Sequence, residues 1–154
     1  MDEKYPLSRR ANGFTVAELV VTVSLLAIVS AIAYPNFQGM AANSNIKTAA
    51  RDLVADFNAL RARAMAESAP LSVTFDLATN RYSFPGLGAG KSPADISRDI
   101  VITQAVFGGG TTVNFMTRGA LSPPGTVILT NRRGSTATIT CNLSGRIHVQ
   151  FNMH

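Results

Sequence analysis

An uncharged apolar run near the N-terminus sets the first limit on what this chain can be. From Leu19 to Ile46 the sequence has no charged residue over 28 positions. A helix rises about 1.5 Å per residue, so residues 14–37 would reach roughly 36 Å, more than the hydrocarbon core of a bilayer at about 30 Å. We therefore expect one membrane span at about 14–37. Arg9 and Arg10 precede it and no comparable basic cluster follows directly, so the N-terminal piece should stay cytoplasmic and the rest should be exported.

The segment after the apolar run has the pattern of an amphipathic helix. Apolar residues make up 46% of the 154-residue chain, which allows a real core and excludes a disordered chain. Their spacing of three, four or seven residues, up to Pro70, predicts that the membrane helix continues and packs one face on that core. The residues on this face are Ile46, Ala50, Leu53, Phe57, Leu60 and Ala64.

Beyond Pro70 the pattern changes from helical to alternating, which is typical of β-strands. Residues 71–77 and 81–84 form a predicted hairpin. Further strands are expected at 99–107, 111–116, 126–130, 137–143 and 146–151. We therefore expect an α+β architecture, in which a helix over residues 14–69 packs on an antiparallel β domain over residues 70–154.

Glu18 stands at the start of the apolar run, where an acid costs on the order of 3 kcal/mol to insert. Three interpretations compete. A signal peptide cleaved after Ala33 would release a soluble secreted binding protein, and Ala31-Ile32-Ala33 supplies the small residues it needs. A plain anchor, like the signal peptide, leaves the acid unexplained. Cleavage between Gly13 and Phe14 would instead create an amine about one helical turn before Glu18, and the two charges would pair.

The third interpretation coincides with a family resemblance. A short basic leader ending in Gly13, followed by Phe14-Thr15-Val16-Ala17-Glu18-Leu19 and a hydrophobic helix, resembles the class III signal of type IV prepilins and type II secretion pseudopilins. The resemblance implies that a prepilin peptidase removes residues 1–13 and methylates Phe14. It also implies that Glu18 neutralises the amine of a neighbouring subunit during assembly, and that Pro35 kinks the helix.

The rest of the chain resembles the FimT/GspH group of minor pilins and minor pseudopilins. The resemblance is carried by "ALRARAMAESAPLSVTFD", by Phe115 with Gly119 four residues on, and by the closing Gly145-Arg146. It implies a pilin-like fold and a single-pass subunit of the bacterial inner membrane, with a periplasmic C-terminal domain, which later enters a pilus or pseudopilus. The implied partners are other minor and major pilins or pseudopilins, the inner-membrane assembly platform and an ATPase. The implied function is a minor type IV pilin or, alternatively, a minor pseudopilin of a type II secretion system, because both systems use the same helix signal.

The C-terminal part is basic, which indicates an anionic partner. From Ile100 onward there is no Asp or Glu, and four arginines give a formal charge of +4. Some FimT-type members bind DNA during natural transformation, so double-stranded DNA is a candidate partner. Arg146 and His148 are two apart on a predicted strand and share a face, while Arg132 and Arg133 lie in a glycine-bounded turn expected to reach the same surface. The alternative is that these are solvated charges that keep the domain soluble.

No residue pattern indicates an enzyme, a cofactor or a metal site. His148 and His154 have no acid after Asp99 to orient them, and Cys141 has no second cysteine beside it. We therefore expect neither a catalytic triad, nor a zinc site, nor a disulfide. The alternating segment around Cys141 favours a packed thiol over a nucleophile.

The glycine-rich segment 86–92 resembles a phosphate-binding loop. Its glycine spacing is one residue short, however, and Pro93 follows at once in place of an established helix. We therefore expect a mobile surface loop there. The nearby acids Asp76, Asp95 and Asp99 are expected to be solvated charges.

Overall fold

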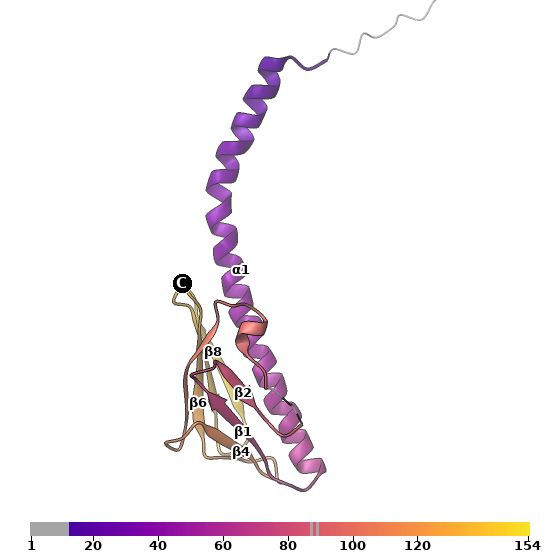
Figure 1. Ribbon diagram of the computed structural model, residues 1–154, viewed down its shortest axis with the longest axis vertical. Coiled ribbons are helices and arrows are strands. Elements are labelled where there is room, and N and C mark those ends of the chain that lie inside the picture. Colours follow the sequence, from indigo (N-terminus) through magenta and orange to yellow (C-terminus); the bar gives the residue numbers. More distant parts are fainter. Residues whose placement is uncertain (1–12, 87, 89) are drawn as a thin grey trace, which may run out of the picture. The chain divides into compact units, whose positions relative to one another are not determined.

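The computed structural model describes residues 13–86, 88 and 90–154, in two compact units that divide after Phe37 (Figure 1). Helix α1, Val16–Ala66, begins in the first unit and ends in the second. Residues 13–37 and residues 38–154 are therefore described separately. The side chains of Pro35 and Asn36 lie outside the described set.

The first unit is the apolar half of α1. Its large apolar side chains from Val16 to Phe37 are at least 57% exposed within the chain, so lipid or other helices must cover them. The hydroxyls of Thr22, Ser24 and Ser30 donate to carbonyl oxygens one turn earlier at 2.6–2.7 Å. These three residues therefore place no unsatisfied hydroxyl in an apolar environment. By length and composition the helix is able to cross a membrane, in agreement with the predicted span.

The second unit consists of the remainder of α1 and two antiparallel four-stranded sheets (Figure 1). The first sheet has the order β2-β1-β4-β5 and contains β1 Leu71–Asp76, β2 Arg81–Ser83, β4 Thr112–Phe115 and β5 Leu121–Ser122. The second has the order β3-β6-β7-β8 and contains β3 Val101–Phe107, β6 Gly125–Thr130, β7 Thr136–Cys141 and β8 Ile147–Asn152. The predicted α+β architecture is thus confirmed.

One apolar core joins α1 to both sheets. All six apolar residues predicted on one helix face are 2% exposed or less, which confirms the predicted amphipathic helix. Phe57 lies at the centre, with its ring centroid 6.1 Å from that of Phe75 in β1 and 5.5 Å from that of Phe115 in β4. Phe75 in turn stacks on Phe107 of β3 at 5.8 Å, so the aromatic cluster connects the helix to the first sheet and the first sheet to the second.

The strand boundaries differ from the predicted ones where a side chain caps the backbone. Asp76 Oδ1 accepts hydrogen bonds from the backbone N–H groups of Ala78 and Thr79, at 3.0 and 3.3 Å. This turn ends β1 at Asp76 and turns Leu77 outward, although the alternation had placed Leu77 in the strand. The hydrogen bond from the Thr79 hydroxyl is the main cause of the lowered pKa of Asp76, and the two backbone hydrogen bonds lower it further. Asp76 is therefore a turn residue as well as the solvated charge that was expected.

Strand β5 was not predicted from the sequence. It has only two residues, Leu121 and Ser122, and pairs with Phe115 and Asn114 of β4. Two residues are too few to show an alternating pattern. Leu121 is nevertheless fully buried, so the segment completes the core under the edge of the first sheet.

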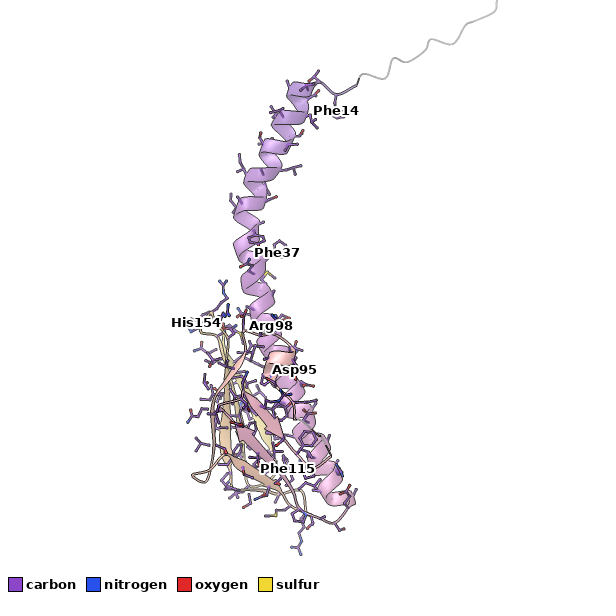
Figure 2. The ribbon with its side chains drawn as sticks, in the orientation of Figure 1. Phe14, Phe37, Asp95, Arg98, Phe115 and His154 are labelled. Atoms are coloured by element: carbon purple, nitrogen blue, oxygen red, sulfur yellow. The ribbon has the colours of Figure 1, made fainter. Side chains whose placement is uncertain are left out.

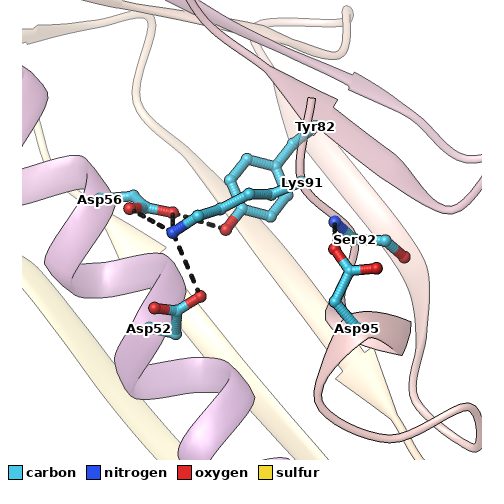
Figure 3. Close-up of polar contacts among 6 residues, drawn as sticks. All are labelled: Asp52, Asp56, Tyr82, Lys91, Ser92 and Asp95. Carbon is cyan, nitrogen blue, oxygen red and sulfur yellow. Dashed lines mark hydrogen bonds and ion pairs between the residues drawn. The ribbon is translucent and has the colours of Figure 1, made fainter. Parts of the chain in front are cut away.

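Lys91 forms an ionic contact between the glycine-rich segment and α1 (Figure 3). Its Nζ lies 2.9 Å from both carboxylate oxygens of Asp56 and 3.5 Å from Asp52. The Tyr82 hydroxyl donates to the same Asp56 carboxylate at 2.7 Å. The hydrogen bond to Asp56 raises the pKa of Lys91, and burial together with Asp56 raises the pKa of Tyr82. We call these four residues the Lys91 clip.

The prediction of a mobile surface loop is therefore wrong for Lys91 and Ser92. Lys91 and Tyr82 also exchange two backbone hydrogen bonds of 2.9 Å, which add Lys91 to the edge of β2. Ser92 and Asp95 then form a reciprocal capping box around the 3₁₀-helix Pro93–Asp95. Asp95 thus caps this turn, which corrects its assignment as a purely solvated charge. A single 3₁₀ turn is not the helix that a phosphate-binding loop requires.

Cys141 ends β7 and is 1% exposed, as expected for a packed thiol. Burial raises the pKa of this thiol to about 12, so the reactive thiolate is scarce while the second unit is folded. Because the sequence contains one cysteine, its labelling by a thiol reagent reports the opening of this unit alone.

Phe57→Ala should destabilise the second unit by about 3–5 kcal/mol, because it removes the ring at the centre of the aromatic cluster and leaves a cavity. The measurement is the urea dependence of Cys141 labelling in the full chain in mild detergent. Phe151→Ala is the control, since this ring is already 38% exposed and its loss should cost about 1 kcal/mol or less. Equal midpoints for the two variants would contradict the central role of Phe57.

Lys91→Met should loosen residues 90–92 while lowering global stability by only about 1 kcal/mol, because the ion pair is partly exposed. Amide exchange at Lys91, whose N–H bonds to Tyr82, should accelerate, whereas the control Lys47→Met, which removes a lysine of α1 outside the Lys91 clip, should leave it unchanged. Because the pKa of Lys91 is raised in the folded chain, the ion pair contributes its full stabilisation below the ordinary lysine pKa of 10.5. This stabilisation is lost only when the pH rises above that value. The difference in stability between wild type and Lys91→Met should therefore stay constant from about pH 6 to pH 9, and a loss within that window would contradict the assignment.

Candidate assembly site and basic surfaces

Glu18 forms a capping box with Thr15 at the start of α1. The Glu18 backbone N–H donates to Thr15 Oγ1 at 3.2 Å, and Glu18 Oε2 accepts from the Thr15 backbone N–H at 3.3 Å. The Thr15 hydroxyl also lies 3.3 Å from the same carboxylate oxygen. The two side chains together satisfy two backbone donors at the start of the helix, with Glu18 accepting from one and Thr15 from the other. The Thr-x-x-Glu spacing was a readable signal for this contact, and the sequence interpretation missed it.

The capping box leaves half of the Glu18 carboxylate available. Only Oε2 takes part in it, and Oε1 has no hydrogen-bond or ion-pair partner among the described residues. Phe14 directly precedes the capping residue, so cleavage before Phe14 would place a new ammonium group beside this box. The arrangement allows Glu18 to cap the helix through one oxygen and to meet an amine through the other.

The bond between Gly13 and Phe14 is exposed. Both residues precede the first helical residue, Phe14 is 85% exposed, and among the described residues no atom apart from those of Gly13 and its chain neighbours lies within 4 Å of the position that a Cβ on Gly13 would take. Residues 1–12, which contain Arg9 and Arg10, lie outside the described residues. Pro35 falls within the bounds of α1, but its side chain is outside the described set, so the predicted kink stays a prediction.

Gly145 of the Gly145-Arg146 pair has a packing role. Its φ is +80°, and an added Cβ would collide with the carbonyl oxygen of Gly119, which itself has a φ of +77°. Arg61 of α1 packs beside both glycines and donates from a terminal guanidinium nitrogen to the Gly145 carbonyl at 3.1 Å. Only glycine fits where the two turns approach each other and the arginine. The neighbouring residues Arg118 and Arg146 are exposed.

The four residues predicted to contact DNA do not lie together. Arg132 and Arg133 are in the turn between β6 and β7, whereas Arg146 is in the turn between β7 and β8. These turns stand at opposite ends of β7, whose six residues span roughly 17 Å. His148 lies in β8 opposite Thr140, near the Arg146 end. The expectation that all four reach one surface is thus wrong, because consecutive hairpin turns of an antiparallel sheet point to opposite ends.

The turn that carries Arg132 and Arg133 is fixed on α1 by buried polar groups. Asn131 is 4% exposed, accepts from the backbone N–H groups of Arg133 and Ser135 at 3.0 Å each, and donates to the Ala42 carbonyl at 3.4 Å. The fully buried Ser135 donates to the Asn43 side chain at 2.7 Å. The two arginines therefore project from a preorganised turn. Arg132 Nε lies 3.0 Å from Asp99, so Asp99 is paired and not merely solvated as expected.

Within residues 13–86, 88 and 90–154, no group of three or more His, Cys, Asp or Glu side chains is placed to hold a metal ion. His148 is exposed on β8. The backbone of His154 bonds to Ser135 and Asn43, which fixes the last strand against the same turn.

A family model described as the prokaryotic N-terminal methylation motif matches residues 8–34. This match covers residues 8–13 of the predicted leader, the exposed Gly13–Phe14 bond, the capping box and most of the apolar part of α1. No curated protein matches the sequence.

Two solved structures share the fold. One is the minor pseudopilin EpsH from the type 2 secretion system of Vibrio cholerae, with a TM-score of 0.55 and 12% identity, covering 70% of this chain and 97% of that one. The other is the type IV minor pilin FimU of Pseudomonas aeruginosa PAO1, with a TM-score of 0.51 and 16% identity, covering 68% of this chain and 91% of that one. This chain thus combines a prokaryotic N-terminal methylation motif with a pilin-like fold.

Proposed function

We propose that this chain is a minor pilin or minor pseudopilin of the FimT/GspH type. In this role a prepilin peptidase cleaves between Gly13 and Phe14 and methylates Phe14. The subunit is held in the inner membrane by the apolar half of α1, with its second unit in the periplasm, and later joins or primes a filament. The observation that carries the proposal is the Glu18 carboxylate, which lies one turn from the exposed Gly13–Phe14 bond and whose Oε1 has no partner among the described residues.

The physical reason for assembly lies in the two charges at the start of α1. Cleavage would leave an ammonium group and a carboxylate at the end of an apolar helix, and an unpaired ion in that environment costs on the order of 3 kcal/mol. When helices pack side by side, the amine of one subunit can meet Glu18 Oε1 of its neighbour. Pairing removes most of this cost only inside the bundle, so it favours assembled subunits over single ones.

The same helix signal serves both type IV pili and type II secretion systems, so the partners belong to one of these two systems. The partners are other minor and major pilins or pseudopilins and the inner-membrane platform with its ATPase. The TM-score ranks the pseudopilin EpsH first and sequence identity ranks the pilin FimU first, so neither comparison favours one system. A minor pseudopilin of a type II secretion system is therefore the alternative. Release of a soluble protein after Ala33 is disfavoured, because it would discard both Glu18 and its capping box.

DNA binding is a second candidate function, now restricted to one end of the second unit. The observation that favours it is that Arg118 and Arg146, both exposed, flank the two glycines that meet at Arg61. His148 lies nearby on β8. Two guanidinium groups on one surface suit contacts to a phosphate backbone without base recognition.

Three variants at the start of α1 separate the capping role of Glu18 from its pairing role. Glu18→Gln keeps an oxygen that can accept from Thr15 but removes the charge, Thr15→Ala removes the cap but keeps the charge, and Glu18→Ala removes both. Loss of the pairing charge should lower recovery of the chain in sheared filaments or in complexes with partner pilins by roughly tenfold or more, in both Glu18 variants. Thr15→Ala should change recovery by about twofold at most, because a helix cap contributes only about 1 kcal/mol.

Leader removal, seen as a shift in gel mobility, checks that each variant still inserts and is processed. If Glu18→Gln were recovered in normal amounts while recovery of Thr15→Ala fell, the carboxylate would act only as a helix cap. That result would reject the pairing step on which the proposed function depends.

A further inference from the structure

A polar pocket lies at the start of the second unit, where α1 meets the turn between β6 and β7. Its volume is about 400 Å³. Three segments line it: Gln38, Ala41, Ala42 and Asn45 of α1, Ser97 and Asp99 before β3, and Asn131, Arg132 and Arg133 of the turn. We call it the Arg133 pocket. Its amide and guanidinium groups are donors suited to an anion.

The charge around the Arg133 pocket is positive. Arg132 and Arg133 line it, exposed Arg98 stands between two lining residues, and Asp99 is the one acid among the lining side chains. Figure 2 shows Arg98 and His154 at this end of the second unit. Arg133 lies across the helix backbone, since a Cβ added at Gly39 would be 3.2 Å from its guanidinium group. Asp99 is already engaged by Arg132, so it neutralises only part of this charge.

The chain ties the Arg133 pocket to the membrane border. Gln38, which lines the pocket, is the residue directly after Phe37, where the predicted span ends. Ala42 is five residues beyond Phe37, which along a helix is about 8 Å. The headgroup layer adds roughly 5–7 Å on each side of the hydrocarbon core, so Ala42 lies near its outer edge. Along the chain, Gln38 is the first residue of the second unit, so the pocket begins directly after the predicted span.

We propose that the Arg133 pocket binds the phosphate groups of anionic phospholipids while the subunit is stored in the membrane. The inference rests on the proposed function only in requiring that the apolar half of α1 spans a bilayer. Guanidinium groups bind phosphate oxygens by paired, charge-assisted hydrogen bonds, and Gln38 and Asn45 add amide donors from the helix. Because Asn131 and Ser135 fix the turn, the arginines need little ordering to bind.

Lipid suits this pocket better than DNA does. A cavity of about 400 Å³ accommodates a headgroup, whereas a duplex is a long polyanion that would need arginines spread along a surface. The arginines that would extend such a surface, Arg118 and Arg146, stand at the other end of β7. The headgroups are also present at high local concentration wherever the span is inserted.

Lipid binding at this pocket would hold the second unit down on the bilayer before assembly. Extraction into a filament would then have to break these phosphate contacts as well as move the helix. The contacts would therefore favour stored subunits over prematurely extracted ones, in a manner that depends on the anionic lipid content of the membrane.

The test uses the full chain reconstituted in nanodiscs of zwitterionic phosphatidylcholine alone or with 30% phosphatidylglycerol, read by amide hydrogen exchange. Residues 131–135 and 97–99 should exchange more slowly in the anionic discs. Each arginine near an anionic surface is worth roughly a fivefold gain in binding, so Arg98→Gln/Arg133→Gln should abolish most of this protection. The charge-matched control Arg118→Gln/Arg146→Gln at the far end of β7 should leave it intact.

The outcomes distinguish this inference from the proposed function. Equal exchange in both disc types, or unchanged protection in Arg98→Gln/Arg133→Gln, would overturn lipid binding while leaving the membrane-stored subunit in place. A chain that fails to reconstitute would overturn the membrane span itself. Protection of 131–135 by a short duplex DNA in zwitterionic discs, with no effect of phosphatidylglycerol, would reassign the pocket to DNA. Exchange in β6 and β7 of the same samples verifies that every variant is folded.

Discussion

Burial of one face of α1 is the interaction on which the second unit depends. Phe57 contacts the aromatic rings of Phe75 in β1 and Phe115 in β4. Phe75 also stacks on Phe107 in β3, so the helix and both sheets share one core. The turn between β6 and β7 is fastened to the same helix through Asn131. The helix therefore determines where both ends of β7, and the arginines on them, are placed.

Before Gln38 the same helix is not buried by the rest of the described chain. Its large apolar side chains are exposed, the hydroxyls of Thr22, Ser24 and Ser30 bond to carbonyl oxygens of the helix, and Glu18 sits in a capping box at the first turn. These features suit a segment that moves between lipid and a bundle of similar helices, because neither environment needs to supply hydrogen bonds along its length. Glu18 is an exception, because its Oε1 has no hydrogen-bond or ion-pair partner among the described residues.

The sequence predicted the features that repeat with a regular period. The helix face from Ile46 to Ala64 and most strands followed from spacings of 3.6 and 2, and the packed Cys141 followed from the same alternation. Strand β5 was too short to show a period. The Lys91 clip joins residues 35 positions apart, and no local pattern indicates such a contact. The Thr15–Glu18 and Ser92–Asp95 capping boxes were readable and were overlooked. The separation of Arg132 from Arg146 could also have been predicted. The two arginines lie on either side of the predicted strand 137–143, and consecutive turns of an antiparallel sheet point to opposite ends.

In the proposed function the chain is cut before the apolar helix, so that Glu18 stays beside a new amine. Intact-mass and N-terminal peptide mass spectrometry of the mature chain, from a host that has a prepilin peptidase, tests this most directly. We predict a single mature species that begins at Phe14 and carries one methyl group on its amine. A mature chain that begins at Tyr34, after the Ala31-Ile32-Ala33 site, would lack both Glu18 and the capping box and would contradict the account.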